Sequence, residues 1–159
     1  MRNAIALWGF LGVVALVGKS LFVLAPVALE VLRPGALDGW QWGVLLVWVA
    51  FMAYGEGFLG FHRKFSPRVV ARAFGLSREP TALRVLLAAP YCLSLFHAPR
   101  RNMVTSWMLV LTIAALVVGV RQIPQPWRGI VDAGVVVGLG IGLTSLVLAF
   151  GRGLRAAEK

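Results

Sequence analysis

The segment "AYGEGFLGFHRKFSPRVVARAFG", Ala53–Gly75, marks the place where a long apolar run ends and a cationic region begins. The apolar run starts near position 41, and His62, Arg63 and Lys64 close it. A helix that crosses ~30 Å of hydrocarbon needs about 20 apolar residues, and basic residues next to such a helix mark its cytoplasmic side. The segment therefore indicates the cytoplasmic end of a transmembrane helix that carries one carboxylate, Glu56.

The composition points to a membrane setting for the whole chain of 159 residues. Hydrophobic residues make up 59% and charged residues 14%, and the mean hydropathy is +0.82. Soluble domains average roughly 45–50% apolar and ~25% charged residues. The net charge is +10, but most cations flank apolar runs, so we expect them to orient the protein and attract anionic lipid rather than nucleic acid. The single cysteine, Cys92, excludes an intramolecular disulfide.

Four apolar segments are long enough to cross a bilayer. The first resembles a signal peptide at its start but continues to Leu32, and we interpret it as an uncleaved span. We predict an all-α integral membrane protein, a four-transmembrane-helix bundle in one polytopic domain, 1–159. The predicted spans are roughly 6–31, 41–61, 103–121 and 129–150. Tryptophans lie near the span ends as an aromatic belt, with Trp48 as the exception inside the second span.

A fifth apolar run, Ala82–Phe96, has 15 residues and contains Arg84 and Pro90. As a helix it would cover only ~22 Å. If it does not cross, twelve of the 16 cations share the side that holds both termini. The positive-inside rule then places both termini and residues 62–102 in the cytoplasm, with 78–98 lying in the interface or re-entering the membrane. A short interfacial helix is predicted to begin at Ser66-Pro67 and to end at Gly75.

Small residues recur on one face of three predicted spans, and such faces let membrane helices approach closely. We therefore predict a compact bundle, although one of these faces could instead serve a partner protein or a second copy. The spacing does not identify the helix that each face contacts. The small residues are Ala50, Ala53, Gly57 and Gly60 in the second span, Thr105, Thr112, Ala115 and Gly119 in the third, and Gly134, Gly138, Gly142, Ser145 and Ala149 in the fourth.

Three ionisable residues lie inside the predicted spans, where charge is costly and commonly functional. Asp132, in the first turn of the fourth span, follows Arg128 by four residues, which favours an ion pair at a helix N-terminus. Lys19 lies near the middle of the first span, and Glu56 lies about two turns from the cytoplasmic end of the second. Helix rise offsets these two by ~10 Å along the membrane normal. We expect both to face protein, as a structural polar lock or as a transport site.

Cations and histidines gather at the predicted cytoplasmic boundary. His62 and His97 each end an apolar segment, and a haem or metal bound by the pair is the alternative to plain boundary residues. The cations form a predicted contact surface for anionic lipid or an acidic partner. They are Arg63, Lys64, Arg68, Arg72, Arg100 and Arg101.

The sequence contains no Ser–His–Asp arrangement, HExxH motif or P-loop, and its predicted external loops are short. We therefore expect a protein without enzymatic activity or cofactor, which acts through helix and lipid contacts as an accessory, assembly or stabilising subunit of a complex in the inner membrane. Its expected partners are the bilayer, anionic lipids, and other membrane proteins or further copies. The alternatives are an oligomeric ion- or proton-coupled transporter or channel using Lys19 and Glu56, and a membrane enzyme or haem carrier using His62 and His97.

Overall fold

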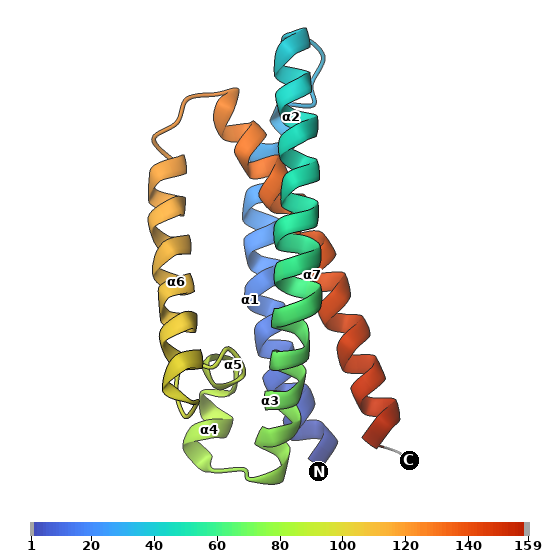
Figure 1. Cartoon of the computed structure of the whole chain (residues 1–159), viewed down its shortest axis with the longest axis vertical. Coiled ribbons are helices and arrows are strands. Elements are labelled where there is room, and N and C mark those ends of the chain that lie inside the picture. The colour runs from blue at the N-terminus through green and yellow to red at the C-terminus, as the bar shows by residue number, and fades with distance from the viewer. Residues whose placement is uncertain (1, 158–159) are drawn as a thin grey trace.

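The computed structural model describes residues 2–157, and every regular element in this part of the chain is helical (Figure 1). The longest helices run along the bundle, and short helices lie at the end that holds both termini. We call this end the terminal end and the opposite one the loop end. The elements are α1 (Arg2–Glu30), α2 (Gly39–Met52), η1 (Ala53–Phe65), α3 (Ser66–Arg78), α4 (Ala82–Leu86), α5 (Ala88–Cys92), α6 (Arg100–Val120) and α7 (Trp127–Ala157).

Four helices are long and apolar enough to cross a membrane, which confirms the predicted number of spans. They cover Ala4–Glu30, Gly39–Arg78, Arg100–Val120 and Trp127–Ala156. The apolar run Ala82–Phe96 is not among them, because it folds as the two five-residue helices α4 and α5. These pack at the terminal end, where the indole Nε1–H of Trp8 donates a hydrogen bond to the carbonyl of Val85 at 3.0 Å.

The second span is one continuous helix built from α2, η1 and α3, so the prediction of a separate helix from Ser66 to Gly75 is wrong. Segment η1 is π-helical, and the backbone N–H of Ser66 donates to the carbonyl of Phe61, five residues earlier. Pro67 would disrupt an α-helix, because it lacks an N–H and its ring meets the carbonyl four residues before it. We attribute the continuity to the wider π turn immediately before Pro67.

The helix also continues past Gly75, because the next residue, Leu76, is fully buried in the core. It ends at Arg78 instead. Residue Glu79 leaves the helical conformation, with φ −129° and ψ 68°. It precedes Pro80, and a residue before proline disfavours the α conformation. The proline, rather than the glycine, therefore sets the end of α3.

The largest buried cluster lies at the terminal end, where α1, α3, α5 and α7 meet. The rings of Phe10 and Phe150 stack there with centroids 3.9 Å apart, and Phe74 also stacks with Phe150, at 5.6 Å. Leu146 of α7 is completely buried in the same cluster. Packing between these four elements holds α1 and α7 together and fixes α5 against them.

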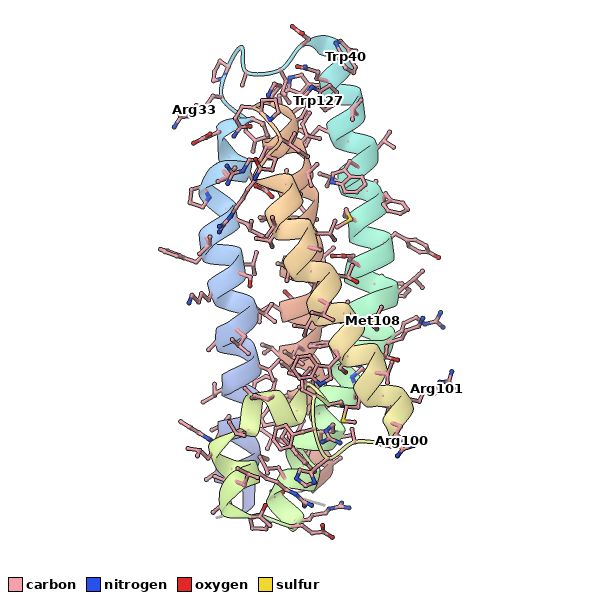
Figure 2. All side chains as sticks on the ribbon, turned by 90° about the vertical axis from the view of Figure 1, so that its left-hand side faces the viewer. Arg33, Trp40, Arg100, Arg101, Met108 and Trp127 are labelled. Atoms are coloured by element: carbon pink, nitrogen blue, oxygen red, sulfur yellow. The ribbon has the colours of Figure 1, made fainter. Side chains whose placement is uncertain are left out.

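Helix α6 differs from the other spans because it stands beside the bundle rather than within it (Figures 1 and 2). From Val104 to Gly119 every residue except Ser106 is exposed. Near the start of α6, Trp107 Nε1–H donates a hydrogen bond to the carbonyl of Leu95, in the connection after α5, at 3.0 Å. Figure 2 shows Arg100 and Arg101 at the start of the helix, near the terminal end.

Candidate functional site

The glycines predicted as a packing face on α7 are buried. A Cβ atom on Gly134 would collide with the indole of Trp48, and one on Gly142 would collide with the ring of Phe61. A Cβ on Gly138 would lie 3.4 Å from the Cβ of Glu56. The face is therefore a true contact face, and its partner is the second span, α2 and η1.

The face predicted on the second span is only partly used. Gly57 is buried, and a Cβ there would lie 3.0 Å from Ile141 of α7. In contrast, Ala50 is exposed, Ala53 is half-buried, and the nearest atom to a Cβ on Gly60 is a carbonyl of the same helix. Large side chains of one helix therefore fill the glycine positions of the other.

Trp48, the apparent exception to the aromatic belt, belongs to this contact. Besides covering Gly134, its indole Nε1–H donates to the carbonyl of Val131 at 3.2 Å. An indole N–H inside a membrane helix requires a hydrogen-bond partner. The position of Trp48 inside the span is thus explained by a bond to α7 rather than by the interface.

Lys19 and Glu56 form no ion pair with each other or with any described residue. Lys19 is exposed on α1, although Gly12 on the same helix packs against Ala89 of α5. Glu56 is also exposed, at the edge of the contact between η1 and α7, beside Gly138. Both side chains are therefore exposed on the surface of the single chain, and the expectation that they face protein stays a prediction.

The two charges nevertheless lie at nearly the same depth. Helix α1 is antiparallel to α7, with Phe10 stacked on Phe150 at one end and Val31 against Gly129 at the other. Counting inward from either contact places Lys19 level with position 141 of α7. That residue, Ile141, contacts Gly57, the neighbour of Glu56. The predicted offset was ~10 Å, whereas this register brings the two levels within about one helical turn, ~5 Å.

Asp132 pairs with Arg128, as their spacing predicts. The distance from Arg128 Nε to Asp132 Oδ2 is 3.8 Å, and the carboxylate side chain is only 6% exposed. Helix α7 begins at Trp127, so Asp132 lies in its second turn rather than its first. The ion pair with Arg128 explains the buried charge of Asp132 without a partner from outside the chain. It lies near the loop end.

Arg72 has a structural role that the sequence does not reveal. Its guanidinium donates to the carbonyls of Tyr91, Phe96 and His97 at 2.6, 3.0 and 3.1 Å. It also lies over the ring of Tyr91, 4.0 Å from the centroid. The segment it holds contains two residues with positive φ, Ser94 at 63° and His97 at 49°. Arg72 thus clamps the irregular chain after α5 onto α3.

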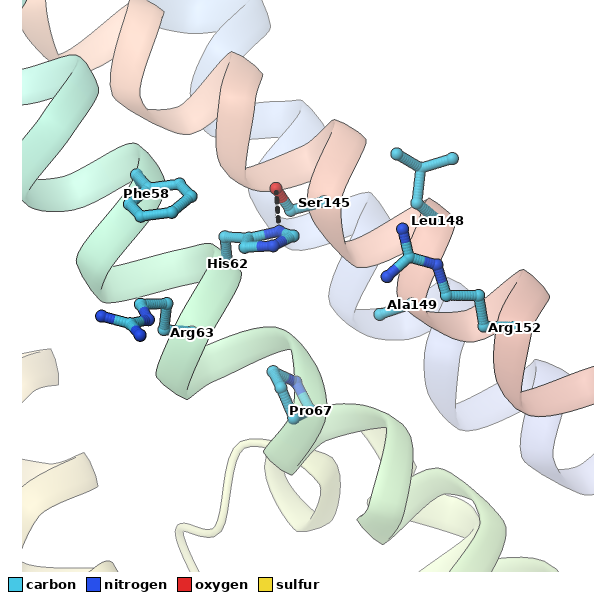
Figure 3. Close-up of a pocket in the computed structure, with 8 residues that line it drawn as sticks. All are labelled: Phe58, His62, Arg63, Pro67, Ser145, Leu148, Ala149 and Arg152. Atoms are coloured by element: carbon cyan, nitrogen blue, oxygen red, sulfur yellow. Dashed lines mark hydrogen bonds between the residues drawn. The ribbon is translucent and has the colours of Figure 1, made fainter. Parts of the chain in front are cut away.

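The two histidines have different neighbours. His62 on η1 lies with Nδ1 3.2 Å from the Oγ of Ser145 on α7 (Figure 3). His97 is exposed in the connection before α6. In the described part of the chain, no three His, Cys, Asp or Glu side chains are grouped so that they could hold a metal ion.

His62 lines a groove of about 360 Å³ between η1 and α7. Two exposed arginines flank it, Arg63 from η1 and Arg152 from α7 (Figure 3). Arg152 and Ser145 were not predicted to belong to a binding site. Both lie near His62 only because α7 packs against the second span at this level. The remaining predicted cations Lys64, Arg100 and Arg101 are exposed, and Arg68 is half-buried.

No known protein family, curated protein or solved structure matches this chain. The function must therefore be inferred from three features of the molecule itself: the unpartnered helix α6, the unpaired charges Lys19 and Glu56, and the cationic groove at His62.

Proposed function

We propose that this protein is a membrane subunit that acts by binding another membrane protein through α6. The observation that carries the proposal is the exposure of α6 on every side from Val104 to Gly119, apart from Ser106. The other three spans pack against one another through extensive contacts. A span that contributes so little to its own bundle is best explained as a surface for an external helix.

The small-residue face of α6 favours a protein over lipid as its occupant. Thr112, Ala115 and Gly119 lie on one side of the helix and are all exposed, and nothing lies within 4 Å of a Cβ placed on Gly119. Small residues let a second membrane backbone approach closely, whereas lipid chains do not require them. On α7 the second span covers the glycines of such a face, whereas the space around Gly119 of α6 is open.

The cation distribution supports an orientation with the terminal end in the cytoplasm of a bacterial-type inner membrane. Arg63, Lys64, Arg100 and Arg101 are exposed toward this end. In this orientation α4 and α5 lie in the cytoplasmic interface, because five residues of helix rise only ~7.5 Å and cannot cross. The protein then acts without chemistry of its own, as an accessory or stabilising subunit.

Two neighbouring alanines of α6 provide a matched test. Ala115 lies on the small-residue face, and Ala114 lies about 100° around the helix; both are exposed. We expect Ala115→Leu to abolish co-purification of a partner from gently extracted native membranes, because the leucine holds the partner backbone away. Ala114→Leu should leave it intact. A solitary monomer from the wild type, or equal effects of the two variants, would contradict the proposal.

A second candidate function follows from the equal depth of Lys19 and Glu56. An oligomer whose symmetry axis runs along the membrane normal keeps every residue at its depth, so Lys19 of one copy can meet Glu56 of the next. Unpaired charges inside a membrane are costly, and such a pair would relieve both. This supports the alternative of an oligomeric ion or proton pathway.

A charge exchange separates this candidate from the first. Lys19→Glu and Glu56→Lys should each break the oligomer, and the combined variant should restore it, as seen by chemical crosslinking in vesicles. Proton flux into the same vesicles should follow the same pattern. If the single variants assemble like the wild type, the ion-pathway candidate fails, while partner binding through α6 is unaffected.

A further inference from the structure

The groove between η1 and α7 has the features of a site for an anion, and it lies away from the face of α6 discussed above. At about 360 Å³ it is comparable to roughly a dozen water volumes of ~30 Å³ each. The contact between His62 and Ser145 lies between the two helices (Figure 3), and Arg63 of η1 and Arg152 of α7 are among the lining residues.

The base of the groove offers a hydrogen-bond donor whichever tautomer His62 adopts. If Nδ1 accepts from the Ser145 hydroxyl, Nε2 carries the proton and can donate to a ligand. If Nδ1–H donates to Ser145 Oγ at 3.2 Å, the hydroxyl hydrogen is free instead. Ser145 is only 8% exposed, so its hydroxyl is already positioned by the packing of α7.

The two arginines supply positive charge without local compensation. Neither Arg63 nor Arg152 forms an ion pair with a described residue, and no acidic side chain lines the groove. Guanidinium groups bind phosphate through paired hydrogen bonds, so two exposed arginines, one from each helix, suit this kind of ligand. Arg63 also lies over the ring of Phe58, 6.0 Å from the centroid, which limits its range of orientations.

The apolar part of the groove distinguishes a lipid from a soluble anion. Phe58 and Leu148 line it and are 44% and 54% exposed. The ring of Phe58 stacks between Tyr54 and His62, with centroids 6.2 and 5.4 Å away. This row of rings runs along the outside of η1, from the depth of Glu56 to the charged end. An acyl chain attached to a headgroup at the charged end could lie along the same path.

We propose that this groove binds the phosphate of an anionic phospholipid, with Arg63 and Arg152 on the phosphate, the His62–Ser145 pair donating to it, and an acyl chain along Phe58 and Leu148. The site is specific: it uses side chains from two helices that only the folded bundle brings together. It would therefore hold a defined lipid between η1 and α7, next to the predicted diffuse cationic surface.

The test uses the full chain in neutral detergent micelles titrated with phosphatidylglycerol, phosphatidylcholine or inorganic phosphate, with bound lipid counted by native mass spectrometry. Arg63→Gln/Arg152→Gln is compared with Arg78→Gln/Arg155→Gln, which removes the same charge from exposed positions outside the groove. We expect about a tenfold or greater loss of phosphatidylglycerol affinity in the first variant and a change of about twofold or less in the control. Ser145→Ala should cost about two- to threefold.

Three results would overturn the proposal. Equal losses in the two double variants would show diffuse attraction to the charged end rather than a site. If phosphatidylcholine bound as tightly as phosphatidylglycerol, the net negative charge of the lipid would play no role in binding. If inorganic phosphate bound as tightly as phosphatidylglycerol, the ligand would be a soluble anion. Circular dichroism of each variant confirms that the helices are intact, and Ser145→Ala tests the groove without changing any charge.

Discussion

Helices α7 and α6 are similarly apolar but have opposite surroundings. Both are apolar helices with small residues on one face, but the face of α7 is filled by Trp48 and Phe61, while nothing lies near a Cβ on Gly119 of α6. Leu146 of α7 is completely buried, whereas Leu111 of α6 is 58% exposed. The difference teaches that a small-residue face predicts a contact without saying whether its partner belongs to the same chain.

The largest expected effect separates the two leucines. Leu146→Ala removes a side chain from the core at the terminal end and should cost ~2–5 kcal/mol, because the neighbouring rings cannot fill the cavity completely. Leu111→Ala should change the stability of the isolated protein by less than ~0.5 kcal/mol. Unfolding in mixed micelles with increasing denaturing detergent measures both. Similar losses would mean that α6 packs into the bundle after all.

The clamp at Arg72 should give the next largest effect. Arg72→Ala removes three hydrogen bonds to carbonyls and the contact with the Tyr91 ring, and should cost ~2–3 kcal/mol. Arg68→Ala is the control, since Arg68 makes no hydrogen bond to described residues and is half-buried one turn earlier. Limited proteolysis of the chain after α5 should accelerate only in the Arg72 variant. Equal cleavage in both would exclude the clamp.

A glycine pair tests the two small-residue faces directly. In Gly142→Ala the new methyl meets the ring of Phe61, and overpacking should cost ~1–3 kcal/mol. In Gly119→Ala it meets open space, so the higher helix propensity of alanine should stabilise the isolated protein by up to ~1 kcal/mol. Thermal unfolding of the two variants measures the difference. A loss in Gly119→Ala would reveal a contact of α6 within the chain.

The smallest effect concerns pH. Cys92 is fully buried between α5 and α1, and burial raises the pKa of its thiol to about 11. The unfolded chain loses this proton near ~8.5, so the thiol contributes stability at neutral pH that is lost as the pH rises from ~8.5 to about 11. We expect wild type and Cys92→Ala to converge in stability over that range. A difference between the two that stays constant with pH would contradict the shift.

Much of the fold could be predicted because its signals are local. The length and polarity of the runs gave the four spans, and Arg128 four residues before Asp132 gave their ion pair. Local reading failed at Ser66-Pro67, where a π turn carries the helix through a proline that would otherwise end it. Pro80 carries the signal for the true end, because the residue before a proline disfavours the α conformation, whereas Gly75 lies within the helix.

The site residues depended on tertiary register, which a single sequence does not contain. Arg72 looked like any basic residue at an interface, because its carbonyl partners lie 19 to 25 positions further along the chain. The relative depth of Lys19 and Glu56 depends on the register between helices, which helix rise within each predicted span does not give. Contacts of α1 and η1 with α7 supply the common reference that the sequence lacks.

The most direct test of the account is photocrosslinking from α6 in native membranes. A photoreactive amino acid is placed at Met108, on the side of the small-residue face, or at Val110, on the opposite side; both positions are exposed. The account predicts a covalent adduct with one membrane protein from Met108 and lipid adducts alone from Val110. Lipid adducts alone from both positions would contradict a docking role for α6.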